Sequence, residues 1–155
     1  MTFLALEKEH EDLNELFFEH QEALLNQDVR LALERLDVYE TKLLAHMKLE
    51  EEQLLPLYAR AGSIPGGPAE FFTGEHKKMR EFLLRFRATL LRLDLPCPNI
   101  TRALISLFDA EAAYKSLTEH HEMREHNLLY PTLDRVTTAE ERMKLIGYLE
   151  SEEKL

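Results

Sequence analysis

Apolar residues recur at alternating spacings of three and four over almost the whole chain, and this period constrains the fold most strongly. It is the period of one face of an α-helix, so we expect an all-α protein. Glycine and proline interrupt the pattern in few places, chiefly at 62–68, 96–98 and 131. The uninterrupted stretches predict four long helices, roughly over residues 3–26, 29–60, 69–94 and 100–129. Because the connections are short, sequential helices should be antiparallel, in an up-down-up-down four-helix bundle.

Residues at the expected helix ends support these limits. Asp28 can cap the second helix and Asn99 can cap the fourth. Gly62 can end the second helix, because glycine adopts the left-handed conformation common after a last helical turn. Pro131 is expected to end the fourth helix near residue 129, because a proline in a helix interior removes a backbone hydrogen bond.

The C-terminal residues predict one more element. Thr138 and Glu141 form a capping box for a short fifth helix over about 138–152. The 155 residues suit a single domain, 1–155, in which the bundle occupies about 3–131.

Composition excludes several classes of function. The chain has 29 acidic and 19 basic residues, and its net charge of −10 argues against nucleic acid and anionic membranes as partners. A membrane-spanning helix needs about 20 apolar residues, and no such stretch occurs. The first residues do not resemble a secretory signal, and the single cysteine, Cys97, cannot form an internal disulfide. We therefore expect a cytoplasmic protein, and its oligomeric state stays open.

Six polar residues interrupt the apolar stripes, where an unpartnered buried polar group costs about 2–7 kcal/mol. They are His10, His46, Glu50, His76, His121 and Glu125. In each His-x3-Glu pair the two side chains are four residues apart and point from the same helix face. At about 1.5 Å per residue, the four histidines lie at the same height within one turn. The six side chains are therefore expected to meet in one layer of the core.

A bound metal ion would offset the free-energy cost of burying these six polar side chains together. Imidazole suits Fe, Zn, Cu or Ni, whereas two carboxylates shared between ions favour a dinuclear site of Fe or Mn. Two carboxylates can bridge two ions while two histidines hold each ion, which leaves open coordination positions for reversible binding or redox chemistry. A metal-free bundle is the weaker alternative, because all six buried groups would need protein partners.

The chain also repeats itself. Residues 39–56 and 114–131 carry the same Tyr, His, Glu, Leu and Pro at a displacement of 75 residues. The pair Glu9-His10 recurs as Glu75-His76, 66 residues further along the chain. Two similar helical hairpins suggest a duplicated unit with a pseudo-twofold axis along the bundle.

Segments 46–56 and 121–131 both read His-x3-Glu-x3-Leu-x-Pro. Together with His10 and His76 they resemble the hemerythrin-like HHE cation-binding domain, over about residues 3–131. Oxygen-carrying hemerythrins have a further histidine at the position of Arg80 and a bridging aspartate at that of His126. The resemblance is therefore to the broader HHE group.

This resemblance implies a non-haem di-iron centre, in which Mn or Zn could replace iron. It also implies the ligands: His10 and His46 for one iron, His76 and His121 for the other, and Glu50 and Glu125 as bridges. The predicted function is binding or sensing of a small ligand such as O2, NO or peroxide, which is favoured over catalysis without excluding it. Iron storage or delivery to damaged iron–sulfur clusters, and a di-iron redox enzyme, are the alternatives. His20, Tyr39 and Tyr114 are expected to be structural, and His120 to lie off the stripe.

Overall fold

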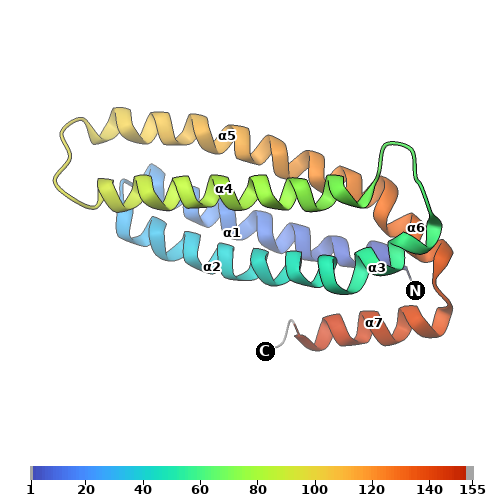
Figure 1. Cartoon of the computed structure of the whole chain (residues 1–155). Coiled ribbons are helices and arrows are strands. Elements are labelled where there is room, and N and C mark those ends of the chain that lie inside the picture. Colours follow the sequence, from blue (N-terminus) through green and yellow to red (C-terminus); the bar gives the residue numbers. More distant parts are fainter. Residues whose placement is uncertain (1, 153–155) are drawn as a thin grey trace.

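The computed structural model describes residues 2–152, and the four expected long helices are present in it (Figure 1). They are α1 (Glu7–Leu25), α2 (Val29–Leu49), α4 (Ala69–Leu93) and α5 (Ile100–Arg124). α1 packs along α2 and α4 packs along α5, while α2 also packs against α4. Consecutive long helices run in opposite directions (Figure 1). The prediction of an all-α, up-down-up-down four-helix bundle is confirmed for residues 2–152.

Local sequence determines most helix ends. The Asp28 side chain accepts a hydrogen bond at 3.1 Å from the amide three residues on, and so caps α2 as predicted. Thr138 and Glu141 form the predicted capping box, with reciprocal hydrogen bonds of 3.0 and 3.1 Å, before α7 (Ala139–Glu152). Asn99 precedes α5 but makes no side-chain capping bond. Its φ of 61° is left-handed, whereas a capping side chain needs an extended backbone to reach the first amides.

The end of the fourth helix differs from the prediction. The chain does not stop near residue 129 but forms a π-helical turn (Glu125–Leu129) and continues as α6 (Tyr130–Val136). Pro131 lies in the first turn of α6, where a missing N–H costs little, because the first amides of a helix have no partner within it. The helical path therefore extends past the predicted limit at residue 131.

The second helix contains the same feature. α2 is followed by a π-helical turn (Glu50–Leu54), by α3 (Leu55–Tyr58) and by one 3-10 turn (Ala59–Ala61). Pro56 lies in the first turn of α3. Gly62 then ends the helical path with a φ of 73°, which glycine adopts without strain, as predicted. The two π-helical turns thus occur at equivalent places in the duplicated pattern.

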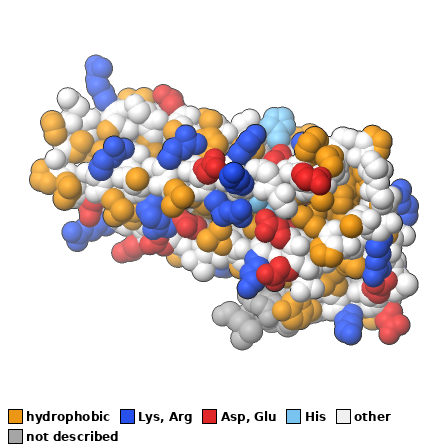
Figure 2. Space-filling view, in the orientation of Figure 1, with side chains coloured by type: hydrophobic (Ala, Val, Ile, Leu, Met, Phe, Trp, Pro, Cys, Tyr) orange, Lys and Arg blue, Asp and Glu red, His pale blue; other side chains and the backbone are white. Residues whose placement is uncertain are grey.

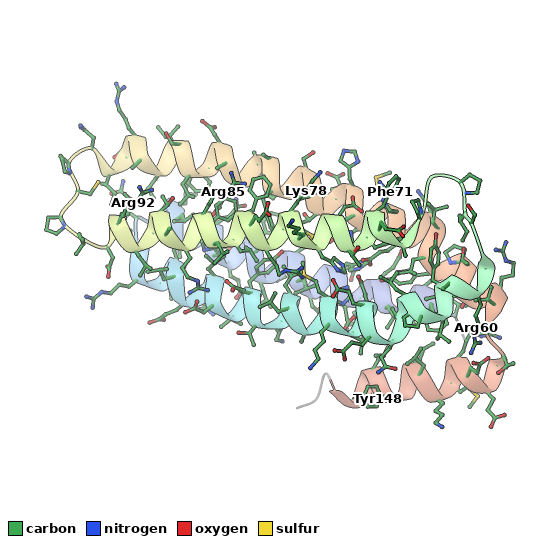
Figure 3. All side chains as sticks on the ribbon, in the orientation of Figure 1. Arg60, Phe71, Lys78, Arg85, Arg92 and Tyr148 are labelled. Atoms are coloured by element: carbon green, nitrogen blue, oxygen red, sulfur yellow. The ribbon has the colours of Figure 1, made fainter. Side chains whose placement is uncertain are left out.

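The C-terminal helix α7 folds back against the end of the bundle where α3 and α6 lie (Figure 1). Its Ile146 and Leu149 join a buried apolar cluster that includes Leu133 of α6 and both ends of a 3-10 turn before α1 (Phe3–Leu6). Arg60 reaches this helix and pairs with Glu141 at 2.9 Å, and Figure 3 shows it between the end of α3 and α7. The predicted fifth helix is therefore packed onto the fold.

Charged side chains of both signs lie on the face of the bundle in Figure 2, with apolar side chains among them. Little histidine shows on this face. Most histidines are inside the protein, the buried ones being His10, His20, His46, His76 and His121. Within residues 2–152, none of the helices has both the length and the apolar content that a membrane crossing requires.

One buried polar pair lies in the half of the core away from the π-helical turns. His20 and Glu111 are both fully buried, and His20 Nε2 lies 2.7 Å from Glu111 Oε2. The Nδ1–H of His20 donates to the Ala32 carbonyl at 2.8 Å, and Gln21 donates to the other oxygen of Glu111 at 3.0 Å. Protein groups therefore satisfy His20, which has the structural role predicted for it. Nothing in the sequence distinguished Glu111 from the surface glutamates.

Candidate metal centre

The six predicted polar residues lie together in the core beside the two π-helical turns. His10 comes from α1, His46 from α2, His76 from α4 and His121 from α5, and Glu50 and Glu125 begin the π-helical turns. Three of the six are fully buried, and the other three are at most 7% exposed. The structure thus brings all of them into one layer.

Their ligand atoms form two overlapping groups. One group contains His10, His46, Glu50 and Glu125, and the other contains Glu50, His76, His121 and Glu125. Within each group the nitrogen and oxygen atoms all lie within 4.8 Å of one another. Each group therefore has two imidazoles of its own and shares both carboxylates with the other group.

Each glutamate turns one oxygen toward each group. Glu50 Oε1 lies 2.5 Å from His46 Nε2, and its Oε2 lies 2.9 Å from His76 Nε2. Glu125 Oε1 lies 2.6 Å from His121 Nε2, and its Oε2 lies 2.6 Å from His10 Nε2. A carboxylate in this position can bridge two cations, one through each oxygen.

Three atoms at the centre lie within ion-pair distance of a neighbouring ligand atom but make no hydrogen bond of proper geometry within the described part of the chain. They are His46 Nε2, Glu50 Oε1 and Glu125 Oε1, and all three are buried. An unsatisfied buried polar atom costs about 1–3 kcal/mol, so three in one place require an explanation. A cation between their lone pairs would satisfy them together, and mixed imidazole and carboxylate donors suit first-row transition metals. The residues therefore fit a pair of metal ions.

The π-helical turns begin at the two glutamates of the site. The amide of Leu55 donates to the Glu50 carbonyl and that of Tyr130 to the Glu125 carbonyl, in each case five residues apart. Turns of this kind are frequent at functional sites. The helical period did not predict them. Their signal in the sequence is a proline six residues after each glutamate, which a regular helix interior cannot hold without a kink.

Three further glutamates hold the rings of the site in place. Each accepts a hydrogen bond from an Nδ1–H: Glu9 from His46 at 2.7 Å, Glu51 from His76 at 2.9 Å, and Glu75 from His121 at 3.3 Å. Such a bond fixes the tautomer, so that the Nε2 lone pair faces the core. Sequence reasoning missed these glutamates as site residues. Their signal is adjacency, because each directly precedes a stripe histidine or directly follows a stripe glutamate.

The carboxylates also raise the pKa values of two of the imidazole rings. Burial lowers the pKa of His46, but Glu50 and Glu9 outweigh it and hold the pKa well above its usual value. Burial likewise lowers the pKa of His121, and its carboxylate neighbours, Glu125 first, raise it well above that value. Burial raises the pKa of Glu50, but the surrounding imidazoles lower it well below its usual range. The site therefore favours positive charge between ionised carboxylates, as a metal site does.

The family model described as the hemerythrin HHE cation binding domain matches residues 2–133. The chain belongs to the hemerythrin HHE family. No curated protein and no solved structure matches it significantly. Membership in the HHE family indicates cation binding, and the two groups of His and Glu side chains could hold the metal.

Two positions at which this HHE chain differs from oxygen-carrying hemerythrins lie outside both groups. Arg80 Nη1 is 3.8 Å from Met47 Sδ and 3.8 Å from a Glu51 oxygen, so the guanidinium lies beside the site. His126 is exposed, and its Nδ1 hydrogen-bonds to Glu7. Within the described residues, neither position contributes a ligand atom to the groups.

Tyr130 adds a phenol to the HHE site. Its hydroxyl donates to Glu125 Oε2 at 2.9 Å and lies 3.2 Å from His10 Nε2. Burial and the negative charge of Glu125 raise the pKa of the phenol well above its usual value, so it remains a hydrogen-bond donor. The sequence predicted no role for it, because a tyrosine on an apolar stripe does not differ from other core aromatic residues.

A cavity of about 20 Å³ lies beside the layer, bordered by His10, His46 and His121. Apolar side chains form much of its wall: Leu13, Leu43, Met47 and Met79. Tyr39 borders it as well. The Tyr39 hydroxyl lies 2.6 Å from the Tyr114 hydroxyl, so the two buried tyrosines satisfy each other's hydrogen-bonding groups, as expected for core residues.

His120 is exposed and takes no part in the HHE site.

Proposed function

We propose that this protein holds two iron ions and binds or senses a small ligand such as O2, NO or peroxide. His10 and His46 hold one ion, His76 and His121 hold the other, and Glu50 and Glu125 bridge them. The observation that carries the proposal is the pair of overlapping groups with both carboxylates in common. The donor set favours iron, with Mn or Zn as substitutes. Bound iron supplies open coordination positions and a change of oxidation state.

The number of protein donors supports ligand binding. Each group offers two imidazole nitrogens and two carboxylate oxygens. Iron commonly takes six donors in sites of this kind, so about two positions on each ion remain for exogenous groups. A closed structural site would have no such positions.

The cavity supports a very small ligand. A volume of about 20 Å³ exceeds the roughly 10–15 Å³ that one water molecule needs, and suits a molecule of two or three atoms. At its edge, Asn14 donates to Glu122 at 3.4 Å, and both residues border the cavity. The apolar side chains in its wall limit the water in contact with whatever binds there, which favours a stable adduct.

Visible spectroscopy of iron-loaded protein tests this function. We expect protein reconstituted without oxygen to develop new absorption bands on addition of O2, NO or peroxide, and the zinc-loaded protein to show none. Leu13→Phe should weaken adduct formation and retain the metal, because Leu13 borders the cavity and is not a ligand. Iron-loaded protein that responds to none of the three would contradict the proposal. Rapid loss of iron to a chelator would favour iron delivery, and turnover of peroxide or NO would favour a redox enzyme.

A further inference from the structure

The duplicated halves of the site repeat one outer contact. Glu9 accepts a hydrogen bond from His46, and its counterpart Glu75 accepts one from His121. The second contact is longer, 3.3 Å against 2.7 Å, and Glu75 also accepts from Arg124 at 3.0 Å. In each of the two groups of ligand atoms, called the metal positions below, one imidazole therefore donates its Nδ1–H to a carboxylate.

The contact made by Glu51 is not repeated in the other half of the site. Its Oε1 accepts from the Nδ1–H of His76 at 2.9 Å. The residue 75 positions further on is His126, which is exposed and bonds to Glu7 instead. In the portion of the chain that the structure describes, the Nδ1 of His10, the counterpart of His76, makes no hydrogen bond to a carboxylate, although, against the lowering effect of burial, the charge of Glu122 helps to raise the pKa of this ring. One position therefore has two carboxylate-backed imidazoles, and the other has one.

A second break lies at Tyr130. Its counterpart in the other half is Leu55, which has no polar side-chain atom. The Tyr130 hydroxyl lies 3.2 Å from His10 Nε2, on the side of the ring that faces the metal groups. Because the phenol proton is donated to Glu125 Oε2, the hydroxyl lies against the ligand atom of His10 and does not support the ring from its Nδ1 side.

The two positions also differ in their access to solvent. His10 and His46 are each 7% exposed, and both border the small cavity. His76 is fully buried and does not border it, although His121 does. The His10–His46 group therefore borders the cavity with both of its imidazoles, and the His76–His121 group with only one.

Building on the dinuclear centre proposed above, we propose that the two metal positions are unequal. The His76–His121 position holds its ion tightly, and the His10–His46 position exchanges its ion. A carboxylate behind a ligating imidazole fixes the ring and raises its basicity, and loss of such a partner costs about 10–100-fold in metal affinity. At low metal concentration the protein carries one ion, and it becomes fully loaded only when metal is abundant. Metal supply thereby regulates how much of the dinuclear centre is complete.

Titration of the metal-free protein with Co²⁺, followed by calorimetry and visible absorption, tests the inequality. We expect two binding events in the unchanged protein, with Kd values at least about 10-fold apart. Glu51→Gln should weaken the tighter event by about 10–100-fold. Its side chain is 35% exposed, so the variant should fold. Glu52→Gln makes the same change of charge at an exposed neighbour and should alter neither event.

The outcomes separate this inference from the dinuclear centre. Binding of a single ion by the unchanged protein would overturn both. Two events with the same Kd would leave the dinuclear centre intact and overturn the inequality, as would a Glu51→Gln variant with an unchanged tighter event. His10→Ala should abolish the weaker event and retain the tighter one, and the reverse result would show that the positions are assigned the wrong way round.

Discussion

Glu50→Gln and Glu125→Gln should each lower bound metal from about two ions per chain to about one or fewer. Each carboxylate has one oxygen near each group, at 2.5 to 2.9 Å from the imidazole nitrogens. The glutamine keeps the shape of the side chain, but its NH2 group cannot act as a ligand. Outer partners alone are worth roughly 10–100-fold in affinity, so loss of a ligand oxygen should cost at least about 100-fold. Metal analysis of the purified variants measures the effect.

His120→Ala is the matched control for these variants. His120 directly precedes a site residue but is exposed, so the variant should keep its metal. If it lost the metal, the assignment of His121 would be wrong. If both glutamine variants kept wild-type loading, the two carboxylates would not be bridges. Circular dichroism checks that each protein retains its helices.

Removal of the metal should lower Tm by roughly 10–20 °C. An ion that binds only the folded state, present at 100 times its Kd, contributes about 2.7 kcal/mol, so two ions contribute about 5 kcal/mol. For a domain of this size, 1 kcal/mol shifts Tm by about 2–4 °C. Thermal unfolding with and without a chelator measures the difference. Equal melting of the loaded and metal-free proteins would contradict a buried dinuclear site.

The stabilisation by metal should increase as the pH rises above about 6.5. In the metal-free protein, neighbouring carboxylates raise the pKa of His46 and His121 despite their burial. Protonation of these rings therefore stabilises the fold below the unfolded-state pKa, and this contribution is lost as the pH passes through the raised values. Metal binding displaces the same protons and strengthens over that interval. Melting curves between about pH 6 and 8.5 should show a widening gap, and a narrowing gap would be inconsistent with proton displacement.

The helical period and the local end signals were enough to predict the bundle. Asp28 and the Thr138–Glu141 box act through atoms a few residues away, so the sequence alone contains the whole interaction. The six core polar residues were also identifiable, because an unpartnered polar group on an apolar stripe is costly wherever the helices meet.

The residues that sequence reasoning missed act across helices or through backbone geometry. Glu9 contacts an imidazole 37 residues away, and Glu51 one 25 residues away, so neither contact follows from a helical period. The π-helical turn after Glu125 reversed the expected effect of Pro131, because the proline falls in a new first turn and not in a helix interior. The Glu111 carboxylate lies on α5 and finds its partner on α1. Such pairings depend on how the helices are rotated about their axes.

Magnetic coupling between two bound ions tests the shared carboxylates most directly. Iron-loaded protein should contain about two irons per chain. In the oxidised state they should give an antiferromagnetically coupled pair in Mössbauer spectra and no signal of isolated ferric iron in electron paramagnetic resonance. A single uncoupled iron per chain, with the resonance of isolated high-spin ferric iron, would contradict a dinuclear centre bridged by Glu50 and Glu125.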